Sequence, residues 1–337
     1  MGFLSSFKAA KNVLTRYGLK VFVRQTLLKL KKHNFEKADL FLERKQVMPV
    51  PSFLEINKEV KELVTVVIPC YNHESFIADA LYSIHEQTYK KIEIIIVDDC
   101  SSDNSVKIIK KLLKAWGKED RFCNLTFIEH KENKGAHYSI NEAVNQGAGE
   151  YFAVLNSDDM YENNRFSVLI NLMKNEDIGL AFSKVKEIDE DGKIKHKTPF
   201  SVLQRNIDNN HIFLGLCSDN LAISSGNLFF KRKVINKIGL FRDFKYIHDW
   251  DFLMRSALIT KIGYSDETTY YYRMHSANSY LELSSMTKLC DDEMVEMRSR
   301  VFKRVYKRYE SDFYSKDDYP KIVDLLYRRI INNSSKT

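Results

Sequence analysis

Tyr151-Phe152-Ala153-Val154-Leu155-Asn156-Ser157-Asp158-Asp159 joins a short apolar run to a cluster of oxygen-bearing side chains. The apolar part has the length and composition of a buried β-strand. In an open α/β sheet, the C-terminal end of a buried strand is where such folds bind their ligands. Two adjacent Asp residues repel each other, so this stretch predicts one of two things. It is either a divalent-cation site for a phosphate-bearing substrate or a solvated turn that caps the next helix.

Strand-like and helix-like patterns alternate on the N-terminal side of this stretch. Apolar, mostly β-branched runs at residues 63–68, 92–97 and 125–128 predict buried parallel strands. Helical periodicity lies between the strands, at residues 76–84, 106–113 and 138–144. This alternation predicts an α/β fold with a doubly wound, mostly parallel sheet flanked by helices.

The predicted strands place polar residues at one edge of the sheet. The strand ends at Pro69, Asp98 and Asn156 are expected to meet there and to form a ligand crevice. Neither GxGxxG nor GxxxxGK[ST] occurs in the chain. A bound phosphate would therefore not lie in a glycine-rich cradle, which favours a metal ion as its partner.

Composition limits the remaining possibilities. The chain has 337 residues, of which 44% are apolar and 29% charged, as in a globular protein with one large domain and appendages or with two domains. Its five cysteines are scattered and odd in number, without CxxC spacing. This pattern favours reduced thiols in a cytoplasmic compartment and gives no zinc site.

The N-terminal region is strongly basic. No Asp or Glu precedes Glu36, although the chain as a whole carries a net charge of +7. Apolar residues at three- and four-residue spacing predict an amphipathic helix over residues 1–35, which would lie on an anionic membrane surface or pack on the body of the protein. No nucleic-acid motif accompanies it. No apolar run approaches the roughly 20 residues that span a bilayer, and no secretory signal is recognisable.

Short motifs follow one another along residues 63–280. In order, they are Val66-Val67-Ile68-Pro69-Cys70-Tyr71-Asn72, Ser83-Ile84-His85-Glu86-Gln87-Thr88-Tyr89, Ile95-Ile96-Val97-Asp98-Asp99-Cys100-Ser101-Ser102-Asp103, Asn133-Lys134-Gly135, Gly149-Glu150-Tyr151, Ser225-Gly226-Asn227-Leu228-Phe229-Phe230, Gly239-Leu240-Phe241 and His248-Asp249-Trp250-Asp251. Together with the opening stretch they resemble family 2 glycosyltransferases with the GT-A fold, of the bacterial surface-polysaccharide type. The resemblance implies a nucleotide-diphosphate-sugar donor.

The resemblance also implies positions that bind the donor nucleotide. By their place in the motifs these are Pro69, Tyr71, Asn72, Asp99 and Asn156. A carboxylate can accept hydrogen bonds from a base edge, and an aromatic ring can stack on the base. The alternative for the tyrosine and the first asparagine is a plain strand-exit turn.

The opening stretch corresponds to the family's metal-binding Asp-X-Asp motif, with Asn156 in place of the first Asp. Asn can supply a carbonyl oxygen but no negative charge. The resemblance therefore makes Asp158 the main ligand of Mg²⁺ or Mn²⁺, with Asp159 supporting it through position or a water. His275 is a further candidate ligand, and a packing or surface histidine is its alternative reading.

The catalytic base is expected in His248-Asp249-Trp250-Asp251. Inverting transfer needs a carboxylate to take the proton of the acceptor hydroxyl. Asp249 matches the family's base, whereas His248 replaces a Glu. Trp250 could stack on the acceptor sugar or pack in the core. Asp251 is expected to be structural.

The sequence thus predicts three regions: a basic helical extension and connector (1–62), a GT-A domain (63–285) and a C-terminal helical segment (286–337). The predicted function is inverting, metal-dependent transfer of a sugar to a lipid-linked saccharide acceptor on the cytoplasmic face of the membrane. The alternatives are a catalytically inactive nucleotide-binding module and a basic membrane or nucleic-acid adaptor. Nucleic acid is not expected as a partner of the enzyme.

Overall fold

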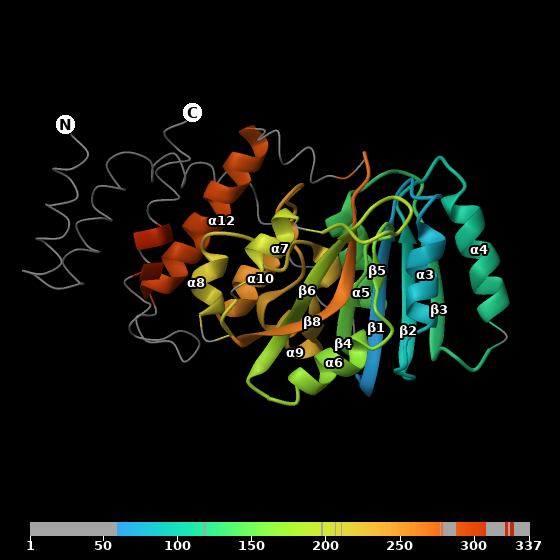
Figure 1. Cartoon of the computed structure of the whole chain (residues 1–337), viewed down its shortest axis with the longest axis horizontal. Helices are drawn as coiled ribbons and strands as arrows, with labels where there is room; N and C mark the ends of the chain where they lie inside the picture. Colours follow the sequence, from blue (N-terminus) through green and yellow to red (C-terminus); the bar gives the residue numbers. More distant parts are fainter. Residues whose placement is uncertain are drawn as a thin grey trace, which may run out of the picture.

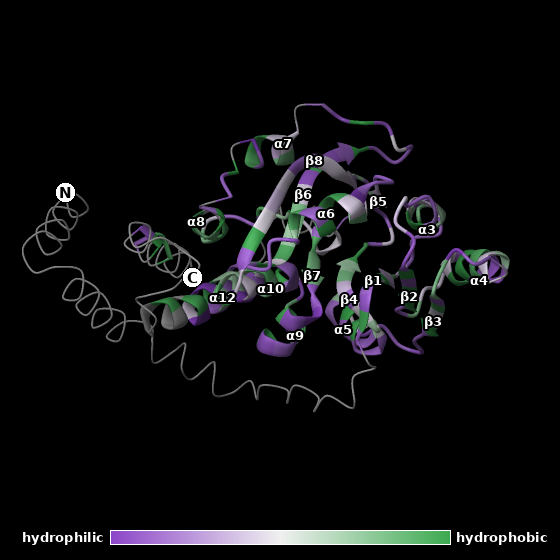
Figure 2. Ribbon diagram, turned by 90° about the horizontal axis from the view of Figure 1, so that it is seen from below, coloured by the Kyte–Doolittle hydropathy of each residue, from purple (hydrophilic) through white to green (hydrophobic). Residues whose placement is uncertain are grey.

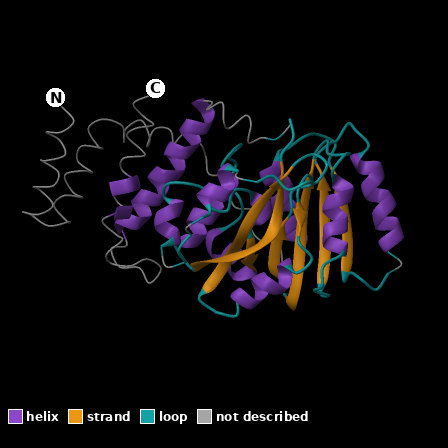
Figure 3. Ribbon diagram, in the orientation of Figure 1, coloured by secondary structure: helices purple, strands orange, loops and turns teal. Residues whose placement is uncertain are grey.

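The computed structural model describes part of the chain, namely residues 59–117, 119–196, 198–205, 207–209, 211–276, 278, 288–307, 321–322 and 324–326. The predicted basic helix at residues 1–35 lies outside the described residues, so its structure is not addressed. Within the described part, Figures 1 and 3 show one sheet flanked by helices.

In the described part of the chain, eight strands form the sheet. They are β1 (Val60–Cys70), β2 (Ile92–Asp98), β3 (Asn124–Glu129), β4 (Gly149–Val154), β5 (Met160–Tyr161), β6 (Ile178–Ile188), β7 (Phe229–Lys231) and β8 (Lys261–Arg273). Their order is β3-β2-β1-β4-β7-β6-β8-β5. The first four are mutually parallel, and β6 pairs in parallel with β8, whereas β7 and β5 pair antiparallel with their neighbours. The predicted mostly parallel, doubly wound sheet is confirmed.

Helices cover both faces. They are α3 (Ile77–His85), α4 (Ser105–Trp116), α5 (Ala136–Gln146), α6 (Arg165–Leu172), α7 (Pro199–Leu203), α8 (Ile212–Leu216), α9 (Arg232–Ile238), α10 (His248–Ala257) and α12 (Lys288–Lys307). Figure 2 shows α3 and α6 on one side of the sheet and α5 and α9 on the other. The helices predicted between the first strands correspond to α3, α4 and α5.

Among the described residues, the alternation of side chains along each strand produces two hydrophobic cores. In β1, Val64, Val66 and Ile68 face the core under α3, α4 and α6. Val67 faces the opposite core, which α5, α8, α9, α10 and α12 cover. Burying one such side chain stabilises the fold by about 1.5–3 kcal/mol. A strand that is covered on both faces therefore has a nearly continuous apolar run.

The C-terminal ends of the central strands meet at one edge of the sheet. Cys70 pairs with Asp98 between β1 and β2, and Val67 pairs with Val154 between β1 and β4. Loops gather over this edge in Figure 3. The predicted convergence of the strand ends is therefore confirmed.

The predicted C-terminal segment is helical where the structure describes it, namely in α12 and at residues 321–322 and 324–326. Met297, Val301 and Val305 are buried against the core under α10. Among the described residues, no helix combines the length and the apolar character that crossing a membrane requires.

Candidate functional site

The loop after β1 is tied to the loop after β2. Asn72 adopts a left-handed backbone conformation with φ of 54°. Its backbone N–H donates to Ser101 Oγ at 2.9 Å, and its side-chain Oδ1 accepts from the Ser102 N–H at 2.8 Å. The neighbouring Tyr71 is 48% exposed. A left-handed asparagine with its side chain bound to the next loop leaves this tyrosine free to contact a ligand. Pro69 precedes it at the end of the strand, paired with Val97 of β2.

The Asp99 carboxylate is buried beneath the same edge. It accepts backbone hydrogen bonds from Lys134 at 2.8 Å and Gly135 at 2.7 Å. Gly135 has a φ of 90°, a conformation that L side chains rarely adopt. The Asn133-Lys134-Gly135 motif therefore forms a turn whose backbone N–H groups bind this carboxylate.

His130 is a neighbour of Asp99 that the sequence analysis missed. Its Nδ1 lies 2.8 Å from the Asp99 carboxylate and its Nε2 lies 2.6 Å from Glu142. Burial alone would lower the pKa of His130, but the hydrogen bonds to the two carboxylates outweigh burial and raise the pKa. The signal in the sequence was its position directly after the third strand.

Asp158 lies at the centre of a cluster of possible metal ligands. Its Oδ2 is 3.0 Å from His275 Nε2 and 3.9 Å from His73 Nε2. One ligand atom from each of these three residues lies within 4.8 Å of the other two. Burial alone would raise the pKa of Asp158, but the hydrogen bond from His275 and the nearby His73 lower it. The structure thus brings the predicted His275 to the predicted Asp158.

His73 was also missed by the sequence analysis. Its Nδ1 lies 2.7 Å from Ser157 Oγ, so the other ring nitrogen faces the cluster. Burial lowers the pKa of His73 and favours the neutral ring. Its place directly after Tyr71 and Asn72 at a strand end was the available signal. A neutral imidazole and a carboxylate are ordinary ligands of divalent transition-metal ions.

Asp159 points away from the cluster. It accepts hydrogen bonds from the Tyr270 hydroxyl, from the Arg273 N–H at 2.9 Å and from the Asn156 amide at 3.1 Å. Burial and the charge of Asp158 raise its pKa well above the usual value. Any support that Asp159 gives to a metal ion is therefore positional.

Arg273 fixes the loop that carries Asp158. This fully buried side chain donates to the Asp158 backbone carbonyl and to the Asp79 carboxylate, both at 2.9 Å. It also donates to the Glu190 carbonyl at 2.7 Å. One guanidinium thus ties the loop that carries Asp158 to α3 and to the turn after β6.

Asp249 lies in the first turn of α10. Its side chain accepts from the Trp250 N–H at 2.7 Å and from the Asn220 amide at 2.9 Å. It is 7% exposed, and burial raises its pKa above the usual value. A carboxylate whose pKa is raised is a stronger base than one in water.

A short segment connects this carboxylate with the opening stretch. Asn220 binds Asp249, and Ser225 Oγ donates to Asn156 Oδ1 at 2.9 Å. Five residues span at most about 18 Å. The predicted base and the end of β4 are therefore held at opposite ends of one short connection.

Trp250 and Asp251 point into the protein. The indole N–H donates to the Leu216 carbonyl at 2.9 Å, and the Arg298 guanidinium lies 5.0 Å from the ring centroid. The tryptophan is therefore a core residue, which was the alternative to acceptor stacking. Asp251 binds Arg255 at 2.7 Å and Arg242 at 3.0 Å, in agreement with its expected structural role.

One known protein family matches the part of the chain that contains most of these motifs. The family described as Glycosyl transferase family 2 matches residues 65–239, which is more than half of the chain. The chain belongs to glycosyl transferase family 2. The match includes the loops after β1, β2 and β4 and ends before Asp249.

Two curated relatives of this family 2 chain are distant in sequence and longer than the region that matches. An uncharacterized glycosyltransferase of Rickettsia felis is 27% identical over 237 residues, which are 68% of this chain and 37% of the relative. The putative teichuronic acid biosynthesis glycosyltransferase TuaG of Bacillus subtilis is 31% identical over 132 residues, 39% of this chain and 50% of the relative. The chain thus spans half or less of the length of these two relatives.

Solved structures agree on the GT-A fold of the family 2 chain. S. aureus TarS (residues 1–349), in complex with UDP-GlcNAc, has a TM-score of 0.60 at 20% identity, covering 80% of this chain and 73% of that one. The mannosyltransferase PcManGT of Pyrobaculum calidifontis, in complex with GDP-Man and Mn²⁺, has a TM-score of 0.53 at 15% identity, covering 92% and 84%. The predicted GT-A fold is confirmed.

His248 is where this family 2 chain departs from the expected acidic pair. Neither ring nitrogen of His248 is exposed or has a hydrogen-bond partner among the residues that the structure describes. Its ring lies 6.2 Å from that of Phe241, edge to face. The structure therefore shows a packed imidazole beside Asp249 with unused hydrogen-bonding capacity.

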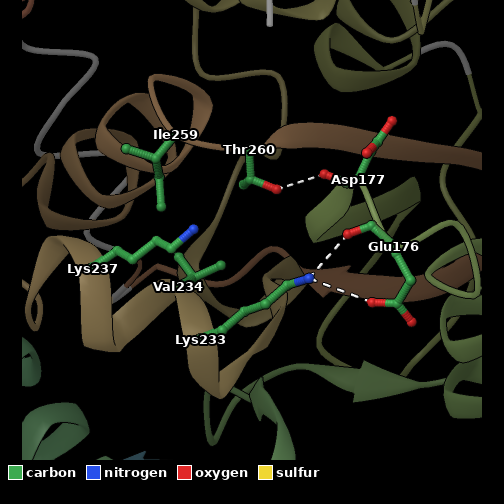
Figure 4. Close-up of a pocket in the computed structure, with 7 residues that line it drawn as sticks. All are labelled: Glu176, Asp177, Lys233, Val234, Lys237, Ile259 and Thr260. Atoms are coloured by element: carbon green, nitrogen blue, oxygen red, sulfur yellow. Dashed lines mark hydrogen bonds and ion pairs between the residues drawn. The ribbon is translucent and has the colours of Figure 1, made fainter. Parts of the chain in front are cut away.

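A small hollow lies at the opposite edge of the sheet (Figure 4). It has a volume of about 180 Å³ and is lined by Glu176, Asp177, Lys233, Val234, Lys237, Ile259 and Thr260. These residues lie on α9 and beside the N-terminal ends of β6 and β8. Lys233 Nζ is bound to Glu176, both to its carbonyl at 2.9 Å and to its carboxylate at 3.5 Å. The hollow is thus separate from the strand ends that carry the candidate site.

Proposed function

We propose that this protein is an inverting glycosyltransferase that moves one sugar from a nucleotide-diphosphate-sugar to a hydroxyl of a saccharide acceptor. The observation that carries the proposal is the buried Asp249 carboxylate, whose pKa is raised and which two donors hold at the start of α10. This carboxylate is tied through residues 220–225 to the loop of the Asp158 cluster.

Asp249 is the proposed base. It takes the proton of the acceptor hydroxyl while the oxygen attacks the anomeric carbon and the nucleoside diphosphate leaves from the opposite face. Inversion follows from a single displacement. Because Trp250 N–H and the Asn220 amide fix the carboxylate, little reorganisation is needed at the moment of proton transfer.

The donor nucleotide is proposed to bind over the ends of β1 and β2. Tyr71 offers an exposed ring for the base, and Pro69 and Asn72 shape the same loop. Asp99 is held by Lys134 and Gly135 in a position to accept one further hydrogen bond. The TarS and PcManGT complexes with UDP-GlcNAc and GDP-Man support a nucleotide sugar on this fold.

A divalent cation, Mg²⁺ or Mn²⁺, is proposed to bind at Asp158 and His275. The donor set fits, because a carboxylate and an imidazole lie 3.0 Å apart and Arg273 fixes the loop from behind. When bound, such an ion neutralises negative charge on the leaving diphosphate.

The test is metal-dependent release of nucleotide from a panel of nucleotide sugars, with and without chelator. Asp249→Asn should reduce transfer by at least about 10²-fold while nucleotide affinity stays near that of the wild type. The control is Asp266→Asn, which alters an exposed carboxylate paired with Lys184 and should leave transfer unchanged. Transfer by Asp249→Asn at the wild-type rate would show that another group is the base.

A second candidate function is nucleotide binding without catalysis. It is favoured by Asn156 and His248, which stand where the family resemblance leads one to expect acids. This candidate predicts tight, metal-dependent nucleotide binding with no release from any donor in the panel. Turnover of a single nucleotide sugar excludes it.

The acceptor is proposed to be a lipid-linked saccharide, reached from the cytoplasmic face of the membrane. The acid-free N-terminal stretch supports an anionic membrane surface as partner, and the name of TuaG connects one relative with teichuronic acid biosynthesis. Deleting residues 1–35 should release the protein from vesicles that contain anionic lipid. Unchanged sedimentation with the vesicles would refute the anchoring role.

A further inference from the structure

We propose that His73 is a third protein ligand of the cation and that the resulting His–Asp–His set selects a first-row transition-metal ion such as Mn²⁺ over Mg²⁺. The inference deepens the proposed function, on which it rests for the role of the ion.

Three separate parts of the chain supply the donor atoms. His73 follows β1, Asp158 follows β4 and His275 follows β8. The imidazole Nε2 atoms lie 3.9 Å and 3.0 Å from the same carboxylate oxygen, and all three donor atoms fall within 4.8 Å of one another. Transition-metal bonds to nitrogen and carboxylate oxygen are about 2.0–2.2 Å long, so ligand atoms of one ion lie roughly 3–4 Å apart. Only a small inward movement is needed to bring all three to one ion.

The His73 ring is oriented as a ligand would be. Its Nδ1 lies 2.7 Å from Ser157 Oγ, and Ser157 is buried. A hydrogen bond at one ring nitrogen leaves the other nitrogen to hold a metal, and such bonds commonly fix metal-ligating histidines. The ring also packs edge to face on Phe76, with centroids 6.1 Å apart, and on His275, with centroids 5.6 Å apart. The orientation of Nε2 toward Asp158 therefore exists before any ion binds.

The chemistry of this donor set disfavours Mg²⁺. Mg²⁺ prefers an octahedron of oxygen atoms and keeps several waters, whereas imidazole suits transition metals. Asn156, which stands where a second acid could add oxygen and charge, is already bound to Asp159, Ser224 and Ser225. The protein thus offers two nitrogens and one carboxylate, with the remaining positions open to oxygens of the donor diphosphate or to water.

A purely structural role of His73 makes a different prediction. In that case only the hydrogen bond to Ser157 and the ring packing matter. His73→Asn separates the two roles, because the Asn side chain overlays the Nδ1 end of histidine and can keep the Ser157 contact, but has no atom at the Nε2 position. His73→Gln instead places an amide oxygen or nitrogen near the Nε2 position.

The experiment measures Mn²⁺ binding to the full chain, without nucleotide, by the loss of the electron paramagnetic resonance signal of free Mn²⁺. Mg²⁺ is then added as a competitor. His73→Asn should bind Mn²⁺ at least about tenfold more weakly than the wild type and should lose discrimination against Mg²⁺. His73→Gln should recover part of the affinity and discriminate less than the wild type. His196→Gln, which removes an exposed imidazole, is the control and should match the wild type.

Three outcomes overturn the inference. They are wild-type Mn²⁺ affinity in His73→Asn, equal affinity of the wild-type protein for Mn²⁺ and Mg²⁺, and no Mn²⁺ binding by the wild-type protein. The first leaves the proposed function intact if Asp158→Asn and His275→Asn still lose Mn²⁺. Failure of the proposed function shows itself elsewhere, as the absence of nucleotide release from every donor sugar in a protein that binds Mn²⁺ through His73.

Discussion

The Asn156 side-chain amide donates a hydrogen bond to the Asp159 carboxylate at 3.1 Å. The same amide donates to Ser224 Oγ at 2.7 Å, and its carbonyl oxygen accepts from Ser225 Oγ at 2.9 Å. An aspartate could still accept hydrogen bonds from both serine hydroxyls, but it could not donate to Asp159, because an ionised carboxylate has no donor. Asparagine at this position is thus a consequence of the buried acid three residues later.

Asn156→Asp is therefore expected to destabilise the protein, although it creates an Asp-X-Asp motif. It removes the N–H that donates to the buried Asp159 carboxyl group and places a second carboxyl group beside it, at a cost of about 1–3 kcal/mol. Denaturant unfolding at pH 7 measures the change. The matched control is Asn171→Asp on the exposed side of α6, which should stay within about 0.5 kcal/mol. A variant as stable as the wild type would mean that the Asn156 amide is dispensable.

The pH dependence of transfer is a second test of Asp249 as the catalytic base. A base must be ionised, so kcat/KM should fall as the pH drops below the pKa of the group. Burial raises the pKa of Asp249 above its usual value of 3.8, so the acid limb should lie at higher pH than for a solvated aspartate. The limb should be absent from the residual activity of Asp249→Asn. If the variant shows the same fall of kcat/KM at low pH as the wild type, a group other than Asp249 causes that fall.

Asp249→Asn should also change stability, in a direction opposite to its effect on activity. Since the folded-state pKa of Asp249 is raised, its contribution to stability is greatest at low pH and is lost as the pH rises through the folded-state pKa. An asparagine at position 249 does not ionise, so this loss of stability at high pH disappears. Its side-chain oxygen can still accept the hydrogen bond from the Trp250 N–H. Its new N–H₂ group can donate to the Asn220 oxygen, which has no partner among the described residues. Thermal unfolding at pH 8 should show the variant at least as stable as the wild type.

The central strands were predictable because they are covered on both faces. Residues 63–68 and 92–97 are apolar except for Thr65 and Glu93, whose buried side chains bind each other, and the structure places both runs in β1 and β2. β7 and β8 gave no comparable signal. β7 has only three residues, and β8 carries polar residues such as Asp266 and Glu267 in its exposed middle. Their pairing depends on contacts between distant parts of the chain, which no local pattern contains.

The candidate site was predictable to the same extent. Asp99 directly follows β2 and Asp158 lies in the loop after β4, so their position at the sheet edge followed from the parallel topology. His73 and His130 also follow strands, but a single histidine has many roles, and nothing local shows what it will face. The direction of Trp250 depends on Leu216 and Arg298, which come from α8 and α12. Only the folded chain decides between a ring that faces a sugar and one that faces the core.

His130 joins the nucleotide end of the site to α5. Its ring connects the buried Asp99 carboxylate with Glu142, and the His130 side chain is itself almost completely buried. Asp99 in turn holds the turn at Lys134 and Gly135. Protonation of His130 therefore places a cation between two carboxylates. It stabilises the buried Asp99 and the turn that Asp99 binds, below the proposed nucleoside position.

His130→Gln should consequently lose stability in a pH-dependent way. The two carboxylates raise the pKa of His130 above the unfolded-state value of 6.5, so its contribution is complete below about pH 6.5 and is lost as the pH rises through the folded-state pKa. The variant should be less stable than the wild type by about 1.5–3 kcal/mol at pH 6, with a smaller difference at pH 9. Denaturant unfolding at both values measures this, with His196→Gln as the exposed control. A difference that grows between pH 6 and pH 9 would contradict the raised pKa.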